Sequence, residues 1–183
     1  MRNLKKQKRK SYKSTIFIFI LFFFIVILYW RFNQEAQEDI PMPTTLNDTV
    51  EKQMNVLIDK AALQGIRVVI TEDYRSAEDQ NRLYQKGRSA EGNIVTYAKG
   101  GESYHNYGLA IDFALLDLNG TVIWDMEYDG NGNGKYDWNE VVKIAKSLGF
   151  DWGGDWTNFK DYPHLQMDFG LSIEELQDGE RPE

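Results

Sequence analysis

The sequence contains two histidines, His105 and His164, and each lies near an aspartate in the chain, Asp112 and Asp161 respectively. Zinc accepts imidazole nitrogen and carboxylate oxygen, and a catalytic zinc with three protein ligands keeps a fourth position open for water. His105, Asp112 and His164 therefore form a candidate zinc set, and Asp161 is a candidate general base and acid for that water. The pattern predicts metal-assisted hydrolysis, although an isolated histidine is more often a satisfied structural residue than a ligand.

The spacing of these residues restricts the elements that carry them. Positions seven apart on a regular strand point to opposite faces, and on a helix they stand about 10 Å apart along the axis. We therefore expect His105 in a loop, a bend at Gly108, and Asp112 on a strand spanning residues 109–116. Pro163 disfavours a helix before His164, so a turn leading into a short strand at 164–169 is expected there.

Three motifs together resemble a family of zinc peptidases that cleave cell-wall peptides. They are Ser103-x-His105-x-x-Gly108-x-Ala110-x-Asp112, Asp161-x-x-His164 and Tyr74-Arg75-Ser76-x-x-x-Gln80-x-x-Leu83-Tyr84. The family includes D-alanyl-D-alanine carboxypeptidases and dipeptidases, and L-alanyl-D-glutamate endopeptidases. The similarity runs from about Pro41 to Phe169.

The resemblance implies a role for each matching residue. His105, Asp112 and His164 become the zinc ligands, Asp161 the catalytic acid and base, and Arg75 the cation beside the scissile carbonyl. An aspartate at the base position is more typical of the endopeptidase branch. The implied activity is zinc-dependent cleavage of the L-Ala–D-Glu bond in peptidoglycan stem peptides; the alternatives are a D-Ala–D-Ala carboxypeptidase and a non-catalytic, calcium-dependent wall-binding module.

Arg75 also has an interpretation from its neighbours alone. It follows an apolar, β-branched run at residues 66–71 that reads as a buried strand, and it precedes Ser76, a helix N-cap with Asp79 in capping-box position. A cation at the end of a strand faces a cleft, where it can stabilise an oxyanion; the alternative is a surface arginine paired with an acidic neighbour. Ser103 is either a loop hydroxyl that satisfies the backbone or a substrate contact.

A second metal-binding pattern lies between the two histidine motifs. The residues from Asp129 to Glu140 match the twelve-residue calcium loop of an EF-hand, and apolar residues at helical spacing follow. The predicted calcium ligands are Asp129, Asn131, Asn133, the Lys135 carbonyl, Asp137 through water, and Glu140. Asn-Gly repeats also form ordinary turns, so a simple turn remains the alternative.

The N-terminus carries a membrane signal. Seven basic residues precede an uninterrupted apolar run at residues 16–30, which at about 1.5 Å per residue reaches roughly 22 Å, less than the ~30 Å hydrocarbon core. No small-x-small cleavage pattern follows, so an uncleaved single-pass anchor with an extracytoplasmic domain is expected, with secretion to the cell wall as the alternative. All 28 acidic residues follow position 34, whereas eight of the 21 basic residues precede it, and nucleic-acid binding is therefore not expected.

The remaining pattern predicts an α+β domain with a small antiparallel sheet and packed helices. We expect helices at 46–63, 76–86 and 138–148, strands at 66–71, 109–116, 121–124 and 164–169, and a long loop at 87–107 that forms an active-site wall. The expected organisation is residues 1–33 as basic N-terminus and anchor, 34–45 as linker, 46–170 as the peptidase domain, and 171–183 as a dispensable acidic tail. The chain has no cysteine, which excludes disulfides and thiolate metal sites.

Overall fold

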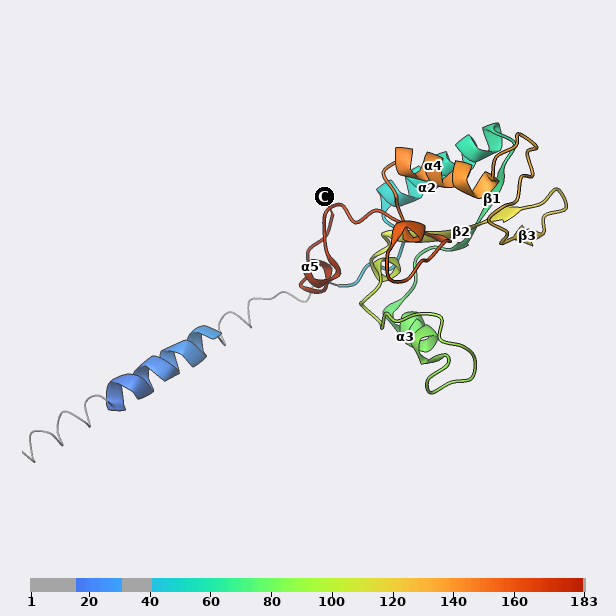
Figure 1. Cartoon of the computed structure of the whole chain (residues 1–183). Helices are drawn as coiled ribbons and strands as arrows, with labels where there is room; N and C mark the ends of the chain where they lie inside the picture. Colours follow the sequence, from blue (N-terminus) through green and yellow to red (C-terminus); the bar gives the residue numbers. More distant parts are fainter. Residues whose placement is uncertain (1–15, 31–40, 183) are drawn as a thin grey trace, which may run out of the picture. The chain divides into compact units, whose positions relative to one another are not determined.

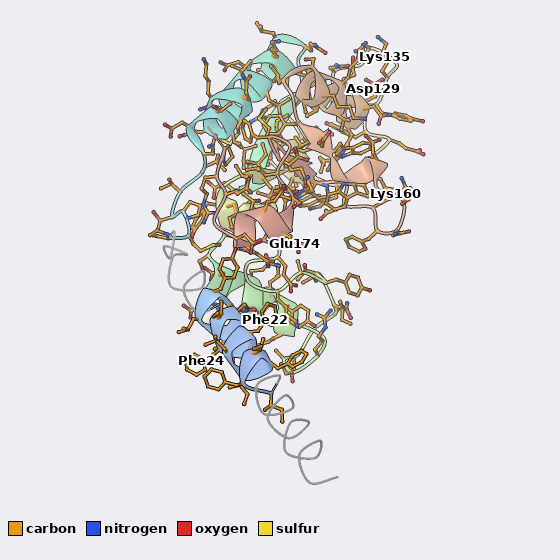
Figure 2. The ribbon with its side chains drawn as sticks, turned by 90° about the vertical axis from the view of Figure 1, so that its left-hand side faces the viewer. Phe22, Phe24, Asp129, Lys135, Lys160 and Glu174 are labelled. Carbon is orange, nitrogen blue, oxygen red and sulfur yellow. The ribbon has the colours of Figure 1, made fainter. Side chains whose placement is uncertain are left out.

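The computed structural model describes residues 16–30 and 41–182, and the chain divides into two compact units, Met1–Ile40 and Pro41–Glu183. In the first unit, residues 16–30 form a helix whose apolar side chains, Phe22 and Phe24 among them, are exposed (Figure 2). Among the residues described, none of the helices combines the length and the apolar character needed to cross a membrane. The basic residues before position 16 and the linker residues 34–40 lie outside the described part of the chain.

The second unit is built on an antiparallel sheet. Its strands are β1 (Arg67–Glu72), β2 (Ala110–Leu116), β3 (Val122–Ile123), β4 (Asp151–Trp152) and β5 (His164–Gln166). The order across the sheet is β1-β2-β5-β4, and β3 pairs with the far end of β2. In the centre, Asp112 of β2 lies opposite His164 of β5. This register brings two distant segments of the sequence together at one point.

Two helices pack against one face of this sheet. α2 (Asp48–Leu63) begins after Asn47, whose side chain accepts hydrogen bonds from the backbone N–H groups of Thr49 and Val50, and it lies beside α4 (Asp137–Ser147) (Figure 1). Their buried side chains form one core with alternate residues of β2, Ile111, Phe113 and Leu115. The expected α+β class, with helices packed on a small antiparallel sheet, is confirmed.

Shorter elements complete the domain. α3 (Ala77–Gln85) begins after Ser76, whose hydroxyl accepts a hydrogen bond from the Asp79 N–H at 3.0 Å. Two 3-10 turns follow, η1 (Tyr104–Tyr107) and η2 (Gly153–Asp155). In Figure 1, α3 and the loop after it extend away from α2 and α4. This outlying loop contributes one wall of the site described below.

The C-terminal segment is a packed part of the domain, which corrects the expectation of a dispensable tail. It contains α5 (Ile173–Gln177), which begins with a capping box between Ser172 and Glu175. Leu176 is 1 % exposed and belongs to the core, and the Tyr104 hydroxyl donates to the Leu171 carbonyl at 2.9 Å. Because these contacts bury apolar surface, removal of the segment would expose the core.

Candidate metal centre

The alternation of side chains along the two central strands places a histidine and an aspartate on the same face of the sheet. On β2, Ile111 and Phe113 point into the core, so Asp112 points to the opposite face. On β5, Leu165 points into the core, so His164 and Gln166 point away from it. Since Asp112 and His164 are paired in the sheet register, their side chains meet.

His105 reaches the same point from the η1 turn. The expected bend lies at Gly108, which has φ +66° and ends the turn. A Cβ at this position would lie 2.3 Å from the Thr45 carbonyl oxygen, so only glycine fits. His105 lies in a 3-10 turn rather than in the open loop that we expected, because the Asn106 N–H donates to the Ser103 carbonyl and the Gly108 N–H to the His105 carbonyl, both i to i+3 bonds.

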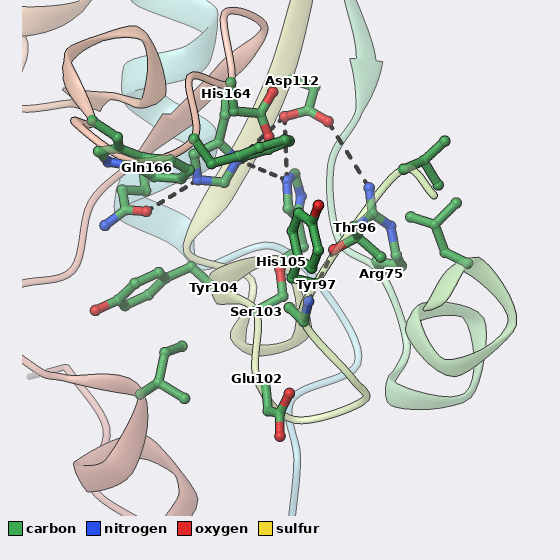
Figure 3. Close-up of a pocket in the computed structure, with 17 residues that line it drawn as sticks. Arg75, Thr96, Tyr97, Glu102, Ser103, Tyr104, His105, Asp112, His164 and Gln166 are labelled. Atoms are coloured by element: carbon green, nitrogen blue, oxygen red, sulfur yellow. Dashed lines mark hydrogen bonds and ion pairs between the residues drawn. The ribbon is translucent and has the colours of Figure 1, made fainter. Parts of the chain in front are cut away.

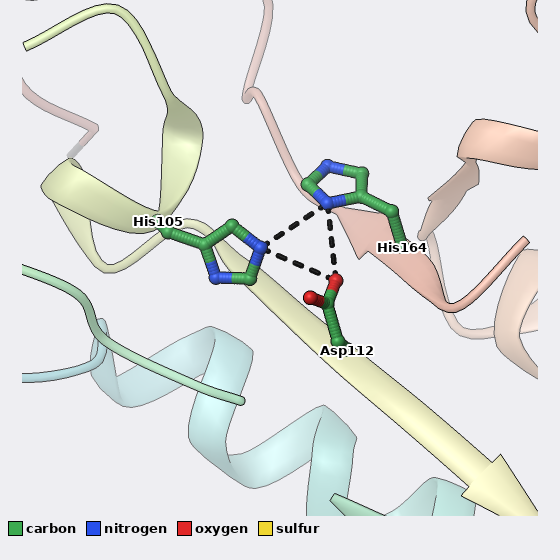
Figure 4. Close-up of side chains that lie close together, drawn as sticks. All are labelled: His105, Asp112 and His164. Atoms are coloured by element: carbon green, nitrogen blue, oxygen red, sulfur yellow. Dashed lines mark hydrogen bonds and ion pairs between the residues drawn. The ribbon is translucent and has the colours of Figure 1, made fainter. Parts of the chain in front are cut away.

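Three ligand atoms converge to form a nearly equilateral triangle (Figure 4). His105 Nε2 lies 3.2 Å from His164 Nδ1, and Asp112 Oδ1 lies 3.3 Å from each of these nitrogens. Ligands at zinc-like distances in a tetrahedron are separated by about 3.3 to 3.6 Å. The triangle therefore has the size of one face of a tetrahedral zinc site.

The outer nitrogens of both imidazoles are held by acceptors, and Figure 3 shows the contact that His164 makes with Gln166. His105 Nδ1 donates to the Asp73 carbonyl at 2.7 Å, and His164 Nε2 donates to Gln166 Oε1 at 3.0 Å. Each ring therefore presents an unprotonated nitrogen to the centre of the triangle. Three lone pairs that face one another repel unless a cation lies between them, so this donor set fits zinc.

The carboxylate of Asp112 points to the same conclusion. Its Oδ1 atom is buried and has no hydrogen-bond partner within the described structure. Burial opposes its ionisation, but the adjacent His105 and His164 side chains outweigh burial and hold the pKa of Asp112 well below its usual range. An ionised carboxylate that faces two unprotonated ring nitrogens calls for a positive charge between them, which a metal ion would supply.

Asp161 lies on the loop that leads from η2 into β5, and its side chain lines the same pocket. The loop passes so close to Gly153 that a Cβ there would lie 2.5 Å from the Asp161 carbonyl oxygen and 3.0 Å from its Cβ. Burial, and then the negative charge of Asp112, raise the pKa of Asp161 above its ordinary value. A raised pKa makes the carboxylate a better proton acceptor near neutral pH.

Arg75 lies beside these groups at the end of β1. Its backbone N–H donates to the His105 carbonyl at 3.1 Å, and its Nη2 lies 3.4 Å from Glu72 Oε2 and 3.9 Å from Asp112 Oδ2. Its side chain is only 12 % exposed. The guanidinium of Arg75 thus lies in the pocket, next to the triangle of His105, Asp112 and His164, rather than on the open surface.

The pocket that contains these residues has a volume of about 610 Å³. Ser103 lines it, as do several residues to which the sequence analysis assigned no individual role, namely Thr96, Tyr97, Trp156, Phe159 and Gln166. The long loop expected as an active-site wall supplies Tyr97, whose ring packs edge-on against Phe159 with centroids 5.8 Å apart. Gln166 could have been found from strand alternation, since it lies two residues after His164; the Asp73 carbonyl has no sequence signal.

The second predicted metal loop adopts a compact turn at the start of α4; Asp129 and Lys135 are labelled in Figure 2. Asp129 accepts from the backbone N–H groups of Asn133 and Gly134, and the Asn131 and Asn133 side-chain amides donate to the Glu140 carboxylate at 2.9 to 3.2 Å. Within the described residues, His105, Asp112 and His164 are the histidine and acidic side chains that lie close enough together to share an ion. The acidic residues of this loop do not form a second group of that kind. Calcium coordination is therefore not shown.

Known proteins resemble this chain closely. A family profile described as D-alanyl-D-alanine carboxypeptidase matches residues 96–167. The peptidoglycan L-alanyl-D-glutamate endopeptidase CwlK of Bacillus subtilis is 58% identical over 152 residues, which are 83% of this chain and 90% of CwlK. The L-alanyl-D-glutamate peptidase of Listeria phage A118 is 35% identical over 124 residues, 68% of this chain and 38% of the phage protein.

Among solved structures, the L,D-carboxypeptidase DacB of Streptococcus pneumoniae is 22% identical to this chain, with a TM-score of 0.49 and coverage of 74% of this chain and 78% of DacB. A similarity at this level does not carry the assignment, which rests on the high identity and coverage of the CwlK match. The chain belongs to the family of zinc peptidases that includes the D-alanyl-D-alanine carboxypeptidases and the CwlK-like peptidoglycan L-alanyl-D-glutamate endopeptidases.

Proposed function

We propose that this protein is a zinc-dependent endopeptidase that hydrolyses the L-Ala–D-Glu bond of peptidoglycan stem peptides. The observation that carries the proposal is the triangle of His105, Asp112 and His164, whose three lone-pair atoms face one another inside a pocket that also holds Asp161 and Arg75. The choice of bond is supported by the activities named for two relatives, CwlK and the phage peptidase.

The proposed ligands are His105 through Nε2, His164 through Nδ1 and Asp112 through one carboxylate oxygen. Zinc, when bound, acidifies a water molecule and polarises the scissile carbonyl. Asp161 accepts the proton from that water and returns it to the amine of the leaving residue. The raised pKa of Asp161 suits it to accept this proton and to hold it until the leaving amine takes it, since at its ordinary pKa the carboxylate would be a weaker base.

Arg75 stabilises the negative charge that develops on the carbonyl oxygen during attack. Its guanidinium is held by fixed partners in a largely buried position, so little reorganisation is needed when that charge appears. Ser103, Tyr97 and Phe159 line the same pocket, where they would contact a bound peptide.

Digestion of a defined muropeptide tests this function. Cleavage of the L-Ala–D-Glu bond creates a new carboxyl terminus on L-Ala and a new amino terminus on D-Glu, both of which mass spectrometry identifies. A D-Ala–D-Ala carboxypeptidase would instead release free D-Ala and leave the L-Ala–D-Glu bond intact. Binding to peptidoglycan without any new terminus, in zinc-loaded protein, would support a wall-binding module and contradict the proposal.

We also propose a calcium site of low affinity in the loop from Asp129 to Glu140. The support is Asp137, which is 2 % exposed and whose Oδ1 is buried without a hydrogen-bond partner within the described structure, while its Oδ2 accepts from the Gly130 N–H at 3.0 Å. Burial, together with the charges of Asp129 and Glu140, raises the pKa of Asp137. A cation among these carboxylates would relieve that repulsion.

Finally, we propose that the domain acts outside the cytoplasm and is held at the membrane by residues 1–33. The support is the sequence pattern of basic residues followed by the apolar run at 16–30. Peptidoglycan lies outside the cytoplasmic membrane, so a substrate of this kind requires export of the domain.

A further inference from the structure

Gln80 is a buried amide on a helix that is otherwise largely exposed. It is the buried residue of α3, and its side chain is 0 % exposed. A buried amide is costly unless its hydrogen-bonding groups are satisfied. The contacts of Gln80 therefore show what this position does for the site.

Both ends of the Gln80 side chain are engaged. Its Oε1 accepts from Arg75 Nη1 at 2.8 Å, and its Nε2 donates to the Ala98 carbonyl at 2.8 Å and faces Thr96 Oγ1 at 3.4 Å. The reversed amide would direct an NH₂ group at the guanidinium and an oxygen at a carbonyl, so the orientation is fixed. One side chain thus connects the pocket cation to the pocket wall.

A neutral acceptor at this position matters for Arg75. The guanidinium has two carboxylates within ion-pair distance, Glu72 at 3.4 Å and Asp112 at 3.9 Å. Without the Gln80 oxygen, charge attraction would draw the guanidinium towards those carboxylates and away from its present position. The amide holds Nη1 without neutralising the positive charge that an oxyanion needs.

The pocket wall depends on similar contacts. Residues 95–98 line the pocket but form neither helix nor strand. Hydrogen bonds from the α3 region hold this segment: Gln80 to Ala98, Arg88 Nη2 to the Thr96 carbonyl at 3.1 Å, and the Gly100 N–H to Asn81 Oδ1 at 2.9 Å. Among these groups Gln80 alone is fully buried and also touches Arg75.

We propose that Gln80 is a positioning residue that sets the Arg75 guanidinium and the wall at Thr96–Ala98 in a fixed mutual geometry. The expected change in kcat and KM rests on the proposed peptidase function, whereas the expected change in the position of the Arg75 guanidinium does not. Gln80 contacts no reacting atom, so it acts through Arg75 on turnover and through the wall on substrate binding.

Two substitutions separate these effects in the full-length, zinc-loaded protein acting on a defined muropeptide. Gln80→Met removes the acceptor and the donors at nearly constant volume, and we expect kcat/KM to fall by about 10- to 100-fold, because displacing a catalytic group by about 1 Å costs rate on that order. Gln80→Glu keeps an acceptor for Arg75 but adds a negative charge beside it and loses the donor to Ala98, so we expect kcat to fall, because the guanidinium charge is partly neutralised, and KM to rise. Gln85→Met, on the exposed face of the same helix, is the matched control and should leave both constants unchanged.

A double-mutant cycle shows whether the effect on turnover passes through Arg75. In an Arg75→Ala background, Gln80→Met should reduce kcat little further, since the group that it positions is already absent. If the two losses in kcat multiply, Gln80 acts on turnover independently of Arg75 and the proposal is overturned.

A measurement that needs no activity completes the test. In wild-type protein, nitrogen-15 NMR should resolve the separate Nη signals of Arg75, because Gln80 hinders rotation of the guanidinium; in Gln80→Met these signals should merge. If the wild-type protein cleaves no muropeptide, the proposed function fails while this result still decides the role of Gln80. Unchanged Arg75 signals in Gln80→Met overturn the proposal. If that variant does not fold, Gln80→Glu decides instead. It should keep the Arg75 signals separate and shift the Ala98 N–H and carbonyl resonances, and unshifted Ala98 resonances would overturn the proposal.

Discussion

Asp112 and Asp161 line the same pocket, yet the protein shifts their pKa values in opposite directions. The adjacent His105 and His164 side chains keep Asp112 ionised, whereas burial and the charge of Asp112 itself favour the protonated form of Asp161. Two carboxylates with such different environments commonly have different tasks in catalysis. At the scale of single residues, Asp112 is suited to hold a cation and Asp161 to carry a proton.

This division predicts the result of Asp161→Ala. Zinc should remain bound at the wild-type stoichiometry, because the three proposed ligands are untouched, while peptidase activity on a muropeptide should fall by about 10² or more. Metal analysis and the rate of release of new amino termini measure the two quantities. Asp155→Ala is the control, because that carboxylate pairs with Lys146 and does not line the pocket. Loss of zinc in Asp161→Ala would make Asp161 a ligand, and unchanged activity would remove it from the mechanism.

Gln166 provides a second prediction at this scale. Its Oε1 atom accepts the hydrogen bond that leaves His164 Nδ1 free to bind zinc, so Gln166→Leu should raise the zinc dissociation constant by about 10- to 100-fold. Gln166→Glu keeps an acceptor and should bind zinc at least as tightly as wild type. Competition with a chromophoric chelator measures both constants without any need for activity. Equal affinities in all three proteins would show that Gln166 does not orient His164.

At the scale of elements, the sequence predicted those features that rest on local rules. The bend at Gly108 and the strand carrying Asp112 followed from side-chain periodicity, and the start of α3 followed from Ser76 and Asp79. β4 has two residues and η2 three, too few to show a period. β4 exists because it pairs with β5, and the loop after it is positioned by the close approach of Gly153 to the Asp161 backbone. Both are tertiary contacts, which a local sequence pattern does not contain.

The C-terminal helix was missed for a different reason. Its capping box, Ser172 with Glu175, is a helix signal visible in the sequence, but the acidic composition suggested a solvated tail. Leu176 is the one fully buried side chain of this helix, and Ile173 packs, partly buried, against the same core. One buried residue gives no amphipathic stripe, so composition outweighed the capping signal in the prediction.

The proposed calcium loop, Asp129 to Glu140, leads directly into α4. With three charged ligands, the affinity should resemble that of extracellular modules, on the order of 10⁻⁴ to 10⁻³ M. Calcium that binds only the folded state should raise the free energy of unfolding by about 2.7 kcal/mol at a hundredfold excess over the dissociation constant. Glu140→Gln should abolish the rise in melting temperature and leave zinc content unchanged, with Glu174→Gln, an exposed residue of α5, as the control. Calorimetry that shows no calcium-dependent shift in wild-type protein at ~10 mM would leave the loop as a simple turn.

At the scale of the whole molecule, charge is distributed very unevenly along the chain. Eight of the 21 basic residues lie in the first 33 positions, which contain no acidic residue, and all 28 acidic residues follow. Basic residues before an apolar segment are retained on the cytoplasmic side of a membrane, so this order favours an exported acidic domain. The apolar segment at 16–30 would cover roughly 22 Å of the ~30 Å hydrocarbon core at about 1.5 Å per residue.

This order predicts where the protein is found in the cell. We expect the full chain in the membrane fraction with an intact N-terminus, and we expect protease added outside the cell to digest the domain, because the basic N-terminus stays inside while the apolar segment holds the chain in place. Fractionation, N-terminal mass spectrometry and protease accessibility measure these outcomes, and a chain that begins at Gln34 is the control that should remain inside the cell. Protein in the medium with a new N-terminus between Asn33 and Asp39 would show instead that the segment is a cleaved signal peptide. Full protection of the domain from protease in intact cells would contradict export altogether, and with it access to peptidoglycan.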